Sequence, residues 1–194
     1  KQDTKNAALT AKVKSALAAD VGLKTLRIDV DSMGNSVTLK GAVDSAETRR
    51  AVEAEGQRCT VMEGDLADPF YCASIIDRTI ADFGRLDILV LNAALREHVH
   101  VDEISFEDWR RVLSTNLDSA FVFTKACLPA LKKAGDGRIV LFAGVTALLG
   151  LKDRVHVAAS KHGIVGLTKA LAQDLAEFGI RGHCVSPGQL DTSR

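Results

Sequence analysis

Residues 155–188 read VHVAASKHGIVGLTKALAQDLAEFGIRGHCVSPG, and the fold of the chain is best approached from this stretch. Apolar residues recur at helical spacing over about 155–178, and Gly179 then ends the pattern. A buried strand and a Pro-Gly turn come next. This order predicts a long helix that covers a sheet and leads directly into one of its strands.

Strands and helices alternate from residue 59 onward. The predicted strands are 59–64, 86–91, 138–143 and 182–186. The second and third of these are continuous apolar runs, which are typical of strands buried on both faces. One helix is predicted from Asp68-Pro69 to Gly84, because proline is favoured at the first helical position. A capping box of Ser105 and Asp108 predicts the start of a second helix, to about residue 133. Repeated strand–helix–strand units predict an α/β fold with a three-layer, mostly parallel, Rossmann-like sheet.

The first 57 residues follow a different pattern. Two alternating runs, 26–32 and 36–43, flank Met33-Gly34-Asn35 and predict a β-hairpin. The predicted helices on either side of this hairpin cover residues 6–19 and 46–55. The order is therefore helix, strand, strand, helix.

Composition excludes several classes of protein. The chain has 25 Lys and Arg residues and 25 Asp and Glu residues, so its net charge is zero. This charge balance does not indicate a nucleic-acid-binding surface. No apolar run reaches the roughly 18 residues of a membrane span. Four widely spaced cysteines predict buried thiols in a reducing compartment and no metal site. We therefore expect a soluble cytoplasmic protein.

Six short motifs occur in a fixed order: Gly64-Asp65-Leu66, Asn92-Ala93-Ala94, Asn116 within STNL, Gly137-Arg138-Ile139-Val140, Ser160-Lys161, and Pro187 to Thr192. Together they resemble the short-chain dehydrogenase/reductase family over about residues 50–194. The resemblance implies that Asp65 hydrogen-bonds the adenine, that Asn92, Ala93 and Ala94 line the cofactor cleft, and that Lys161 holds the nicotinamide ribose. It also implies that Pro187, Gly188 and Thr192 lie against the nicotinamide.

The catalytic positions of that family are only partly matched. Asn116 and Lys161 correspond to two of four positions. The family's tyrosine acid lies four residues before the lysine, where this chain has Val157, and its serine lies thirteen residues earlier, at Gly144. His156 is the best candidate for a replacement acid, because imidazole titrates near neutral pH. Thr146 is a candidate to replace part of the serine's role.

Two further departures concern the cofactor and the substrate. A glycine-rich turn normally offers backbone N–H groups to the pyrophosphate. Residues 41–47 hold one glycine together with Asp44 and Glu47, whose charges repel phosphate. We therefore expect no tightly bound cofactor, and NAD(P) if any. The sequence also ends at Arg194, before the family's substrate-covering lid.

The N-terminal residues resemble a second family. L-T-x-K-V-K-x-A-L, I-D-V-D and G-N-S-V-T-L-K-G-A-V-D-S, over about residues 4–52, resemble the BON domain, a bacterial module often linked to the envelope or to phospholipid. No lipid-binding motif can be carried over, so lipid association is not expected. We predict a BON-like segment over 1–57 and a truncated dehydrogenase-like segment over 58–194, joined as a chimera. Strand 26–32 is predicted to run antiparallel beside 86–91 in one fused sheet.

These patterns leave three functions open. The first is an oxidoreductase-family scaffold with little or no NAD(P)-dependent dehydrogenase activity. The second is an assembly or binding module that forms a homo-oligomer through helices 106–133 and 155–178. The small residues expected to allow close packing there are Ala158, Ala159, Gly163 and Gly166. The third is a weak NAD(P)H-dependent carbonyl reductase that uses His156.

Overall fold

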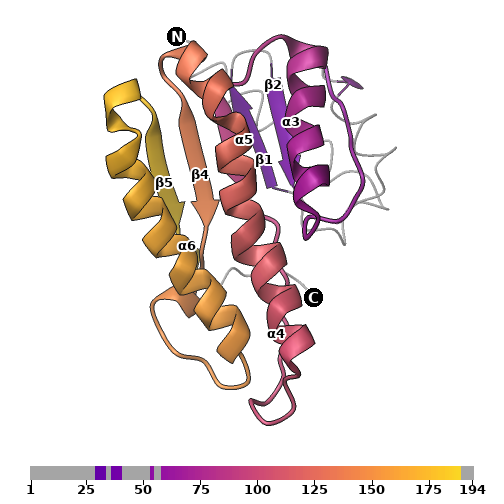
Figure 1. Cartoon of the computed structure of the whole chain (residues 1–194), viewed down its shortest axis with the longest axis vertical. Helices are drawn as coiled ribbons and strands as arrows, with labels where there is room; N and C mark the ends of the chain where they lie inside the picture. The colour runs from indigo at the N-terminus through magenta and orange to yellow at the C-terminus, as the bar shows by residue number, and fades with distance from the viewer. Residues whose placement is uncertain (1–28, 34–35, 41–52, 55–57, 189–194) are drawn as a thin grey trace. The chain divides into compact units, whose positions relative to one another are not determined.

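The computed structural model describes residues 29–33, 36–40, 53–54 and 58–188 (Figure 1). The chain divides into two units, residues 1–63 with 191–194 and residues 64–190, and each is described by itself. The predicted helix over 6–19, most of the predicted helix over 46–55, the glycine-poor turn at 41–47 and Thr192 lie outside the described residues.

The hairpin predicted in the first unit is present. Strands β1 (Asp29–Met33) and β2 (Ser36–Lys40) pair antiparallel, with Met33 opposite Ser36 across a two-residue connection. Its place beside the strands of the second unit stays a prediction, and so does the division of the chain at residue 57.

The second unit contains a parallel sheet. Strands β3 (Ile88–Leu91), β4 (Arg138–Phe142) and β5 (Arg181–Val185) pair in the order β3-β4-β5, and both pairings are parallel. Parallel neighbours need a crossover segment, which the helices between these strands supply. The Rossmann-like α/β prediction is confirmed. As a result, the carboxyl ends of all three strands meet at one edge.

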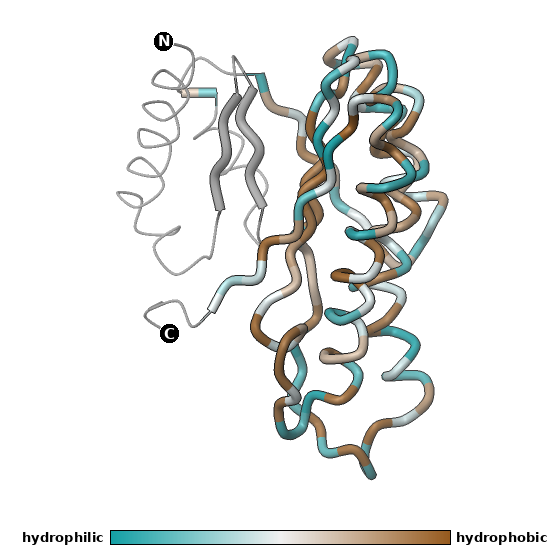
Figure 2. The backbone as a smooth tube through the Cα atoms, turned by 90° about the vertical axis from the view of Figure 1, so that its left-hand side faces the viewer, coloured by the Kyte–Doolittle hydropathy of each residue, from teal (hydrophilic) through white to brown (hydrophobic). Residues whose placement is uncertain are grey.

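Helices α3 (Pro69–Phe83), α5 (Ser119–Ala134) and α6 (Val155–Asp174) lie along one face of this sheet (Figure 2). The predicted start and end of α3 and the predicted start of α4 are confirmed. Asp68 accepts a hydrogen bond from the Phe70 N–H, and Gly84 ends α3 in the left-handed conformation. Ser105 accepts from the Asp108 N–H at 3.0 Å and starts α4 (Phe106–Leu113).

One feature of the helices was not predicted. The helix expected over 106–133 is interrupted by a π-helical turn, η1 (Ser114–Asp118), between α4 and α5. Short 3₁₀ turns, η2 (Val145–Ala147) and η3 (Ala176–Phe178), precede and follow α6. Gly179, at φ 70°, then ends the helical stretch that was predicted for 155–178.

One strand prediction is wrong, and another is confirmed in its position but not in its burial. Residues 59–64 form no strand, and only Cys59 and Met62 among them are even half-buried, so little apolar surface holds this segment against a sheet. The strand after α6 is not buried on both faces. His183 and Val185 are exposed, because the described helices cover one face of β5 alone.

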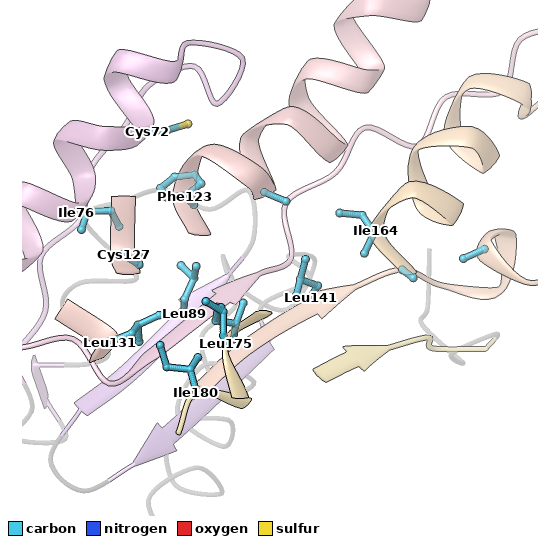
Figure 3. Close-up of a cluster of buried hydrophobic side chains, with 14 residues drawn as sticks. Cys72, Ile76, Leu89, Phe123, Cys127, Leu131, Leu141, Ile164, Leu175 and Ile180 are labelled. Atoms are coloured by element: carbon cyan, nitrogen blue, oxygen red, sulfur yellow. The ribbon is translucent and has the colours of Figure 1, made fainter. Parts of the chain in front are cut away.

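The core lies between this sheet and the helices. Leu89, Ile139 and Leu141 come from the strands, and they pack against side chains of α3, α5 and α6 (Figure 3). The helical members and those that follow the helices include Cys72, Ile76, Phe123, Cys127, Leu131, Ile164, Leu175 and Ile180. No disulfide joins the described cysteines, and burial raises the pKa of Cys127 to about 12. Among the described residues, no helix combines the length and apolar character needed to cross a membrane.

One of the small residues of α6 allows close packing within the chain itself. A Cβ on Gly163 would lie 2.7 Å from Leu117 Cδ2, so Gly163 lets α6 approach η1 within the same chain. Ala159 and Gly166 are exposed. Self-association through these helices stays a prediction.

We predict that Gly179→Ala lowers the free energy of unfolding by at least about 1–2 kcal/mol, because alanine disfavours the left-handed conformation. Its Cβ would also lie 2.8 Å from the Gly135 carbonyl oxygen. Gly166→Ala is the matched control. It adds a methyl group where no atom lies within 4 Å, on a helix that favours alanine. Urea unfolding checks both, and equal midpoints for the two variants would contradict this account.

Candidate active site

Three loops converge at the carboxyl edge of the parallel sheet. Residues 92–94 follow β3, residues 143–145 follow β4 and residues 186–188 follow β5. The Ala143 N–H donates to Val185 O at 2.9 Å, and the Val145 N–H donates to Pro187 O at 3.2 Å. The structure therefore brings Asn92, Ala93 and Ala94 to the same edge as Pro187 and Gly188. This is the edge at which ligands bind in open parallel sheets.

The amide of Asn116 ties one of these loops to α6. Asn116 lies in the π-helical turn and is 3% exposed. Its Oδ1 accepts from the Leu95 N–H at 2.7 Å, while Nδ2 donates to Leu95 O and to Ser160 Oγ, each at 3.0 Å. Ser160 in turn donates to Val157 O at 2.8 Å. The side chain is thus satisfied by scaffold contacts and fixes the loop after β3.

Lys161 is buried at the same edge. Its side chain is 5% exposed, and Nζ donates to the carbonyl oxygen of Phe142, the last residue of β4, at 2.7 Å. Burial lowers the pKa of Lys161 to about 8, because a low-dielectric environment disfavours the ammonium. The charge of Arg96 lowers it further, and Cys184 acts in the opposite direction. Such a strongly perturbed lysine is a typical feature of functional sites.

The two unmatched positions have different surroundings. Val157 is 1% exposed and carries no polar side-chain atom. Gly144 has φ 111°, a region that serine rarely adopts. However, a Cβ on Gly144 would lie 3.9 Å from Thr146 Oγ1. The Thr146 hydroxyl therefore lies next to the place that a side chain at 144 would occupy.

His156 is placed against the loop after β3. It is fully buried, neither ring nitrogen has a hydrogen-bond partner among the described residues, and Nε2 lies 3.7 Å from Glu97 Oε2. Glu97 is held by Arg111 in two hydrogen bonds, of 2.5 and 2.9 Å, which lower the pKa of this carboxyl. His156 thus faces Glu97, whereas Lys161 faces Phe142. A catalytic role for His156 stays a prediction.

Asp65 lies in the turn before α3. It is exposed, and its Oδ1 accepts from the Ala67 N–H at 2.8 Å. Its role toward adenine stays a prediction. Within the described part of the chain, no three His, Cys, Asp or Glu side chains come together as a metal site.

Sequence analysis missed the groups that position Lys161 and Asn116. Arg96 and Glu97 lie two and three residues after the Asn92-Ala93-Ala94 motif, so their closeness to this motif was a usable signal. The carbonyl of Phe142 and the backbone of Leu95 leave no mark in a sequence, because every residue carries these groups.

Comparison with known proteins identifies the family. The model of the short chain dehydrogenase family matches residues 22–194. The chain belongs to this family. It is 37% identical over 163 residues to an uncharacterized NAD-dependent oxidoreductase of Mycobacterium tuberculosis, covering 82% of this chain and 59% of the relative. It is 29% identical to a 3-oxoacyl-[acyl-carrier-protein] reductase of Synechocystis, covering 95% of this chain and 76% of the relative.

Solved structures of the family share this fold. Carveol dehydrogenase of Mycobacterium avium in complex with NAD matches with a TM-score of 0.71 and 31% identity, over 76% of this chain and 54% of that one. Acetoin dehydrogenase of Enterobacter cloacae matches with a TM-score of 0.69 and 34% identity, over 74% and 59%. The chain spans between about half and three fifths of the length of the first curated relatives, 59% of one and 52% of another.

These findings correct the functional prediction. Little or no NAD(P)-dependent activity was expected from the missing tyrosine, serine and glycine-rich turn, whereas the relatives and structural neighbours are NAD(P)-dependent oxidoreductases. That prediction is wrong. The family match also begins at residue 22 and includes much of the segment that resembles a BON domain. The BON-like assignment and the chimera stay predictions.

We predict that Asn116→Ala lowers the free energy of unfolding by about 1–3 kcal/mol, because the Leu95 N–H and C=O lose their amide partner. Ser114→Ala is the control in the same turn, since its hydroxyl makes a 3.4 Å contact with Asp118. We expect this control to change the free energy by no more than about 0.5 kcal/mol. Urea unfolding distinguishes the two, and equal losses would contradict the role given to Asn116.

Proposed function

We propose that the protein is an NAD(P)-dependent oxidoreductase that interconverts a carbonyl compound and an alcohol at the carboxyl edge of β3, β4 and β5. The observation that carries this proposal is the buried Lys161, whose ammonium lies at the end of β4 beside the Asn116 network. The names of the relatives support the reaction type. They include a 3-oxoacyl reductase, a carveol dehydrogenase and an acetoin dehydrogenase.

The described residues fit the nicotinamide half of the cofactor. Among the described residues, no atom lies within 4 Å of the position that a Cβ on Gly188 would occupy, which leaves room for a ligand beside this backbone. Asn92, Ala93, Ala94 and Pro187 would line this space, and Lys161 would hold the ribose. When bound, the nicotinamide supplies or accepts the hydride. Because residues 41–47 offer one glycine and two acidic side chains to the phosphates, we propose that the cofactor binds weakly and exchanges freely.

Thr146 would supply the hydroxyl that Gly144 lacks. The side chain is 7% exposed and belongs to η2, which packs on α6. A hydroxyl there can donate to a substrate oxygen and orient it, since Thr Oγ1 is both donor and acceptor. The backbone of Gly144 explains why the hydroxyl comes from the next turn, because φ 111° is strained for any residue with a Cβ.

Calorimetric titration with NADH and NADPH tests the proposed function. We expect saturable binding to the protein weaker than about 1 µM, which corresponds to less than about 8 kcal/mol of binding free energy. We also expect one of the two cofactors to be oxidised in the presence of 2,3-butanedione or acetoacetyl thioester. No binding of either cofactor would overturn the proposal, and nanomolar binding would overturn the weak-binding part alone.

We predict that Thr146→Val lowers kcat for carbonyl reduction by about tenfold or more, because a lost hydrogen bond in the transition state costs at least about 1.4 kcal/mol. Cofactor affinity should change little. Thr79→Val is the matched control, since the Thr79 hydroxyl bonds to Ile75 O within α3. Steady-state measurements of kcat for the two variants test this prediction. An unchanged kcat in Thr146→Val would remove Thr146 from the site.

A further inference from the structure

We propose that Lys161 is itself the proton donor of this site, giving an ammonium proton to the oxygen of the carbonyl substrate. This inference rests on the proposed function and deepens it by naming the acid. It also gives Lys161 a second task, beyond holding the cofactor's ribose.

The first argument concerns the groups around the ammonium. Val157, one helical turn before Lys161, has no proton to give, and Gly144 has no side chain. The amide of Asn116 is committed to Leu95 and Ser160 through three hydrogen bonds. Each of these positions is thereby excluded as the acid.

The second argument concerns His156, the buried histidine of this helix segment. Its ring faces Glu97 at 3.7 Å and is fully buried, so a substrate at the strand edge does not reach either nitrogen in this conformation. Lys161 points the other way, to the end of β4. The helix thus separates the two groups, since neighbouring residues are rotated by about 100° and the faces of 156 and 161 differ.

The third argument concerns the protons of Lys161. An ammonium has three donors, and the Phe142 carbonyl takes one of them. The other two have no acceptor among residues 58–188 and the other described segments. A carbonyl oxygen of the substrate would satisfy one of them, and a buried donor without a partner favours such a contact.

The electrostatic environment supports the same role. Burial and Arg96, from the loop after β3, lower the pKa of Lys161 to about 8, while Cys184, from β5, raises it. A general acid works best when its pKa lies near the working pH, and a lysine at about 8 is largely protonated at neutral pH yet releases its proton readily. An exposed lysine, near 10.5, would hold the proton too tightly.

The reaction balances without another residue. The carbonyl carbon gains a hydride, that is, one proton and two electrons, and the reduced nicotinamide is thereby oxidised. The C=O π electrons move to oxygen, an N–H bond of Lys161 breaks, and the new O–H bond completes the alcohol. The neutral amine then regains a proton from water.

A direct titration of Lys161 is the first test, and it needs no turnover. Protein labelled with ¹³C at lysine Cε is titrated by NMR, and the Lys161 signal is assigned by its loss in Lys161→Met. We expect a midpoint near pH 8, well below the range of the exposed lysines. A midpoint in the range of exposed lysines would overturn the proposal whatever the activity.

Kinetics supply the second test. The wild-type rate of carbonyl reduction should fall as pH rises through the NMR midpoint, because the acid must be protonated. Lys161→Arg keeps the charge and the hydrogen-bond donors but does not release a proton near neutral pH. We expect it to bind NADH or NADPH within about tenfold of wild type while reduction falls by about 100-fold or more. Lys169→Arg, an exposed position on the same helix, is the control and should retain the wild-type rate and pH profile.

The outcomes separate the two proposals. Failure of wild-type protein to bind either cofactor overturns the proposed function and this inference with it. Cofactor binding with a Lys161→Arg variant that reduces the substrate at the wild-type rate overturns the acid role alone. Cofactor binding with no reduction by wild type at any pH also overturns the acid role.

Discussion

The amide of Asn116 is the contact on which the geometry of the site depends. It is almost fully buried, and it joins the backbone of Leu95 to the hydroxyl of Ser160 on α6. Hydrogen bonds are stronger in such a low-dielectric position, and an unpaired group there is costly. The extra residue of the π-helical turn gives this segment a geometry that a regular helix lacks, as is frequent at functional sites. Loop, turn and helix are therefore fixed as one unit at the carboxyl edge.

The contacts at the two edges of the parallel sheet have opposite effects on the stability of the fold. At the amino edge, Asp136 is paired with Arg138 and Arg181, and Gly179 closes tightly against Gly135. These contacts are mutually favourable. At the carboxyl edge, an ammonium is buried with a single carbonyl as its hydrogen-bond partner among the described residues, and Arg96 adds like charge. Burial of a charge lowers stability unless it is well compensated. The packing of the core must compensate for this loss of stability. Such a destabilising arrangement is expected at a functional site.

Sequence patterns predicted the scaffold well because single residues fix it. Two helices start where the side chain of Asp68 or Ser105 accepts a backbone hydrogen bond. Two helical stretches end where Gly84 or Gly179 adopts the left-handed conformation. The π-helical turn escaped prediction because STNLD carries no periodic signal. The strand expected at 59–64 failed because an apolar-looking segment forms a strand only when a neighbouring layer buries it. Of the site, Asn116 and Lys161 could be predicted from sequence motifs, but their partners are largely backbone groups, which any sequence supplies.

The functional misjudgement has a physical cause as well. Inactivity was inferred from the side chains at 144 and 157, the missing glycine-rich turn and the missing lid, as though a site were a set of fixed positions. Chemistry requires a hydroxyl and an available proton in the right place, and neither has to come from a particular residue. The Thr146 hydroxyl lies 3.9 Å from the position that a Cβ on residue 144 would occupy. The burial that makes Lys161 unfavourable for stability also moves its pKa to about 8, where an ammonium can act as an acid. In the family arrangement a lysine assists a tyrosine. With valine in that tyrosine's place, the proposed acid is the lysine itself.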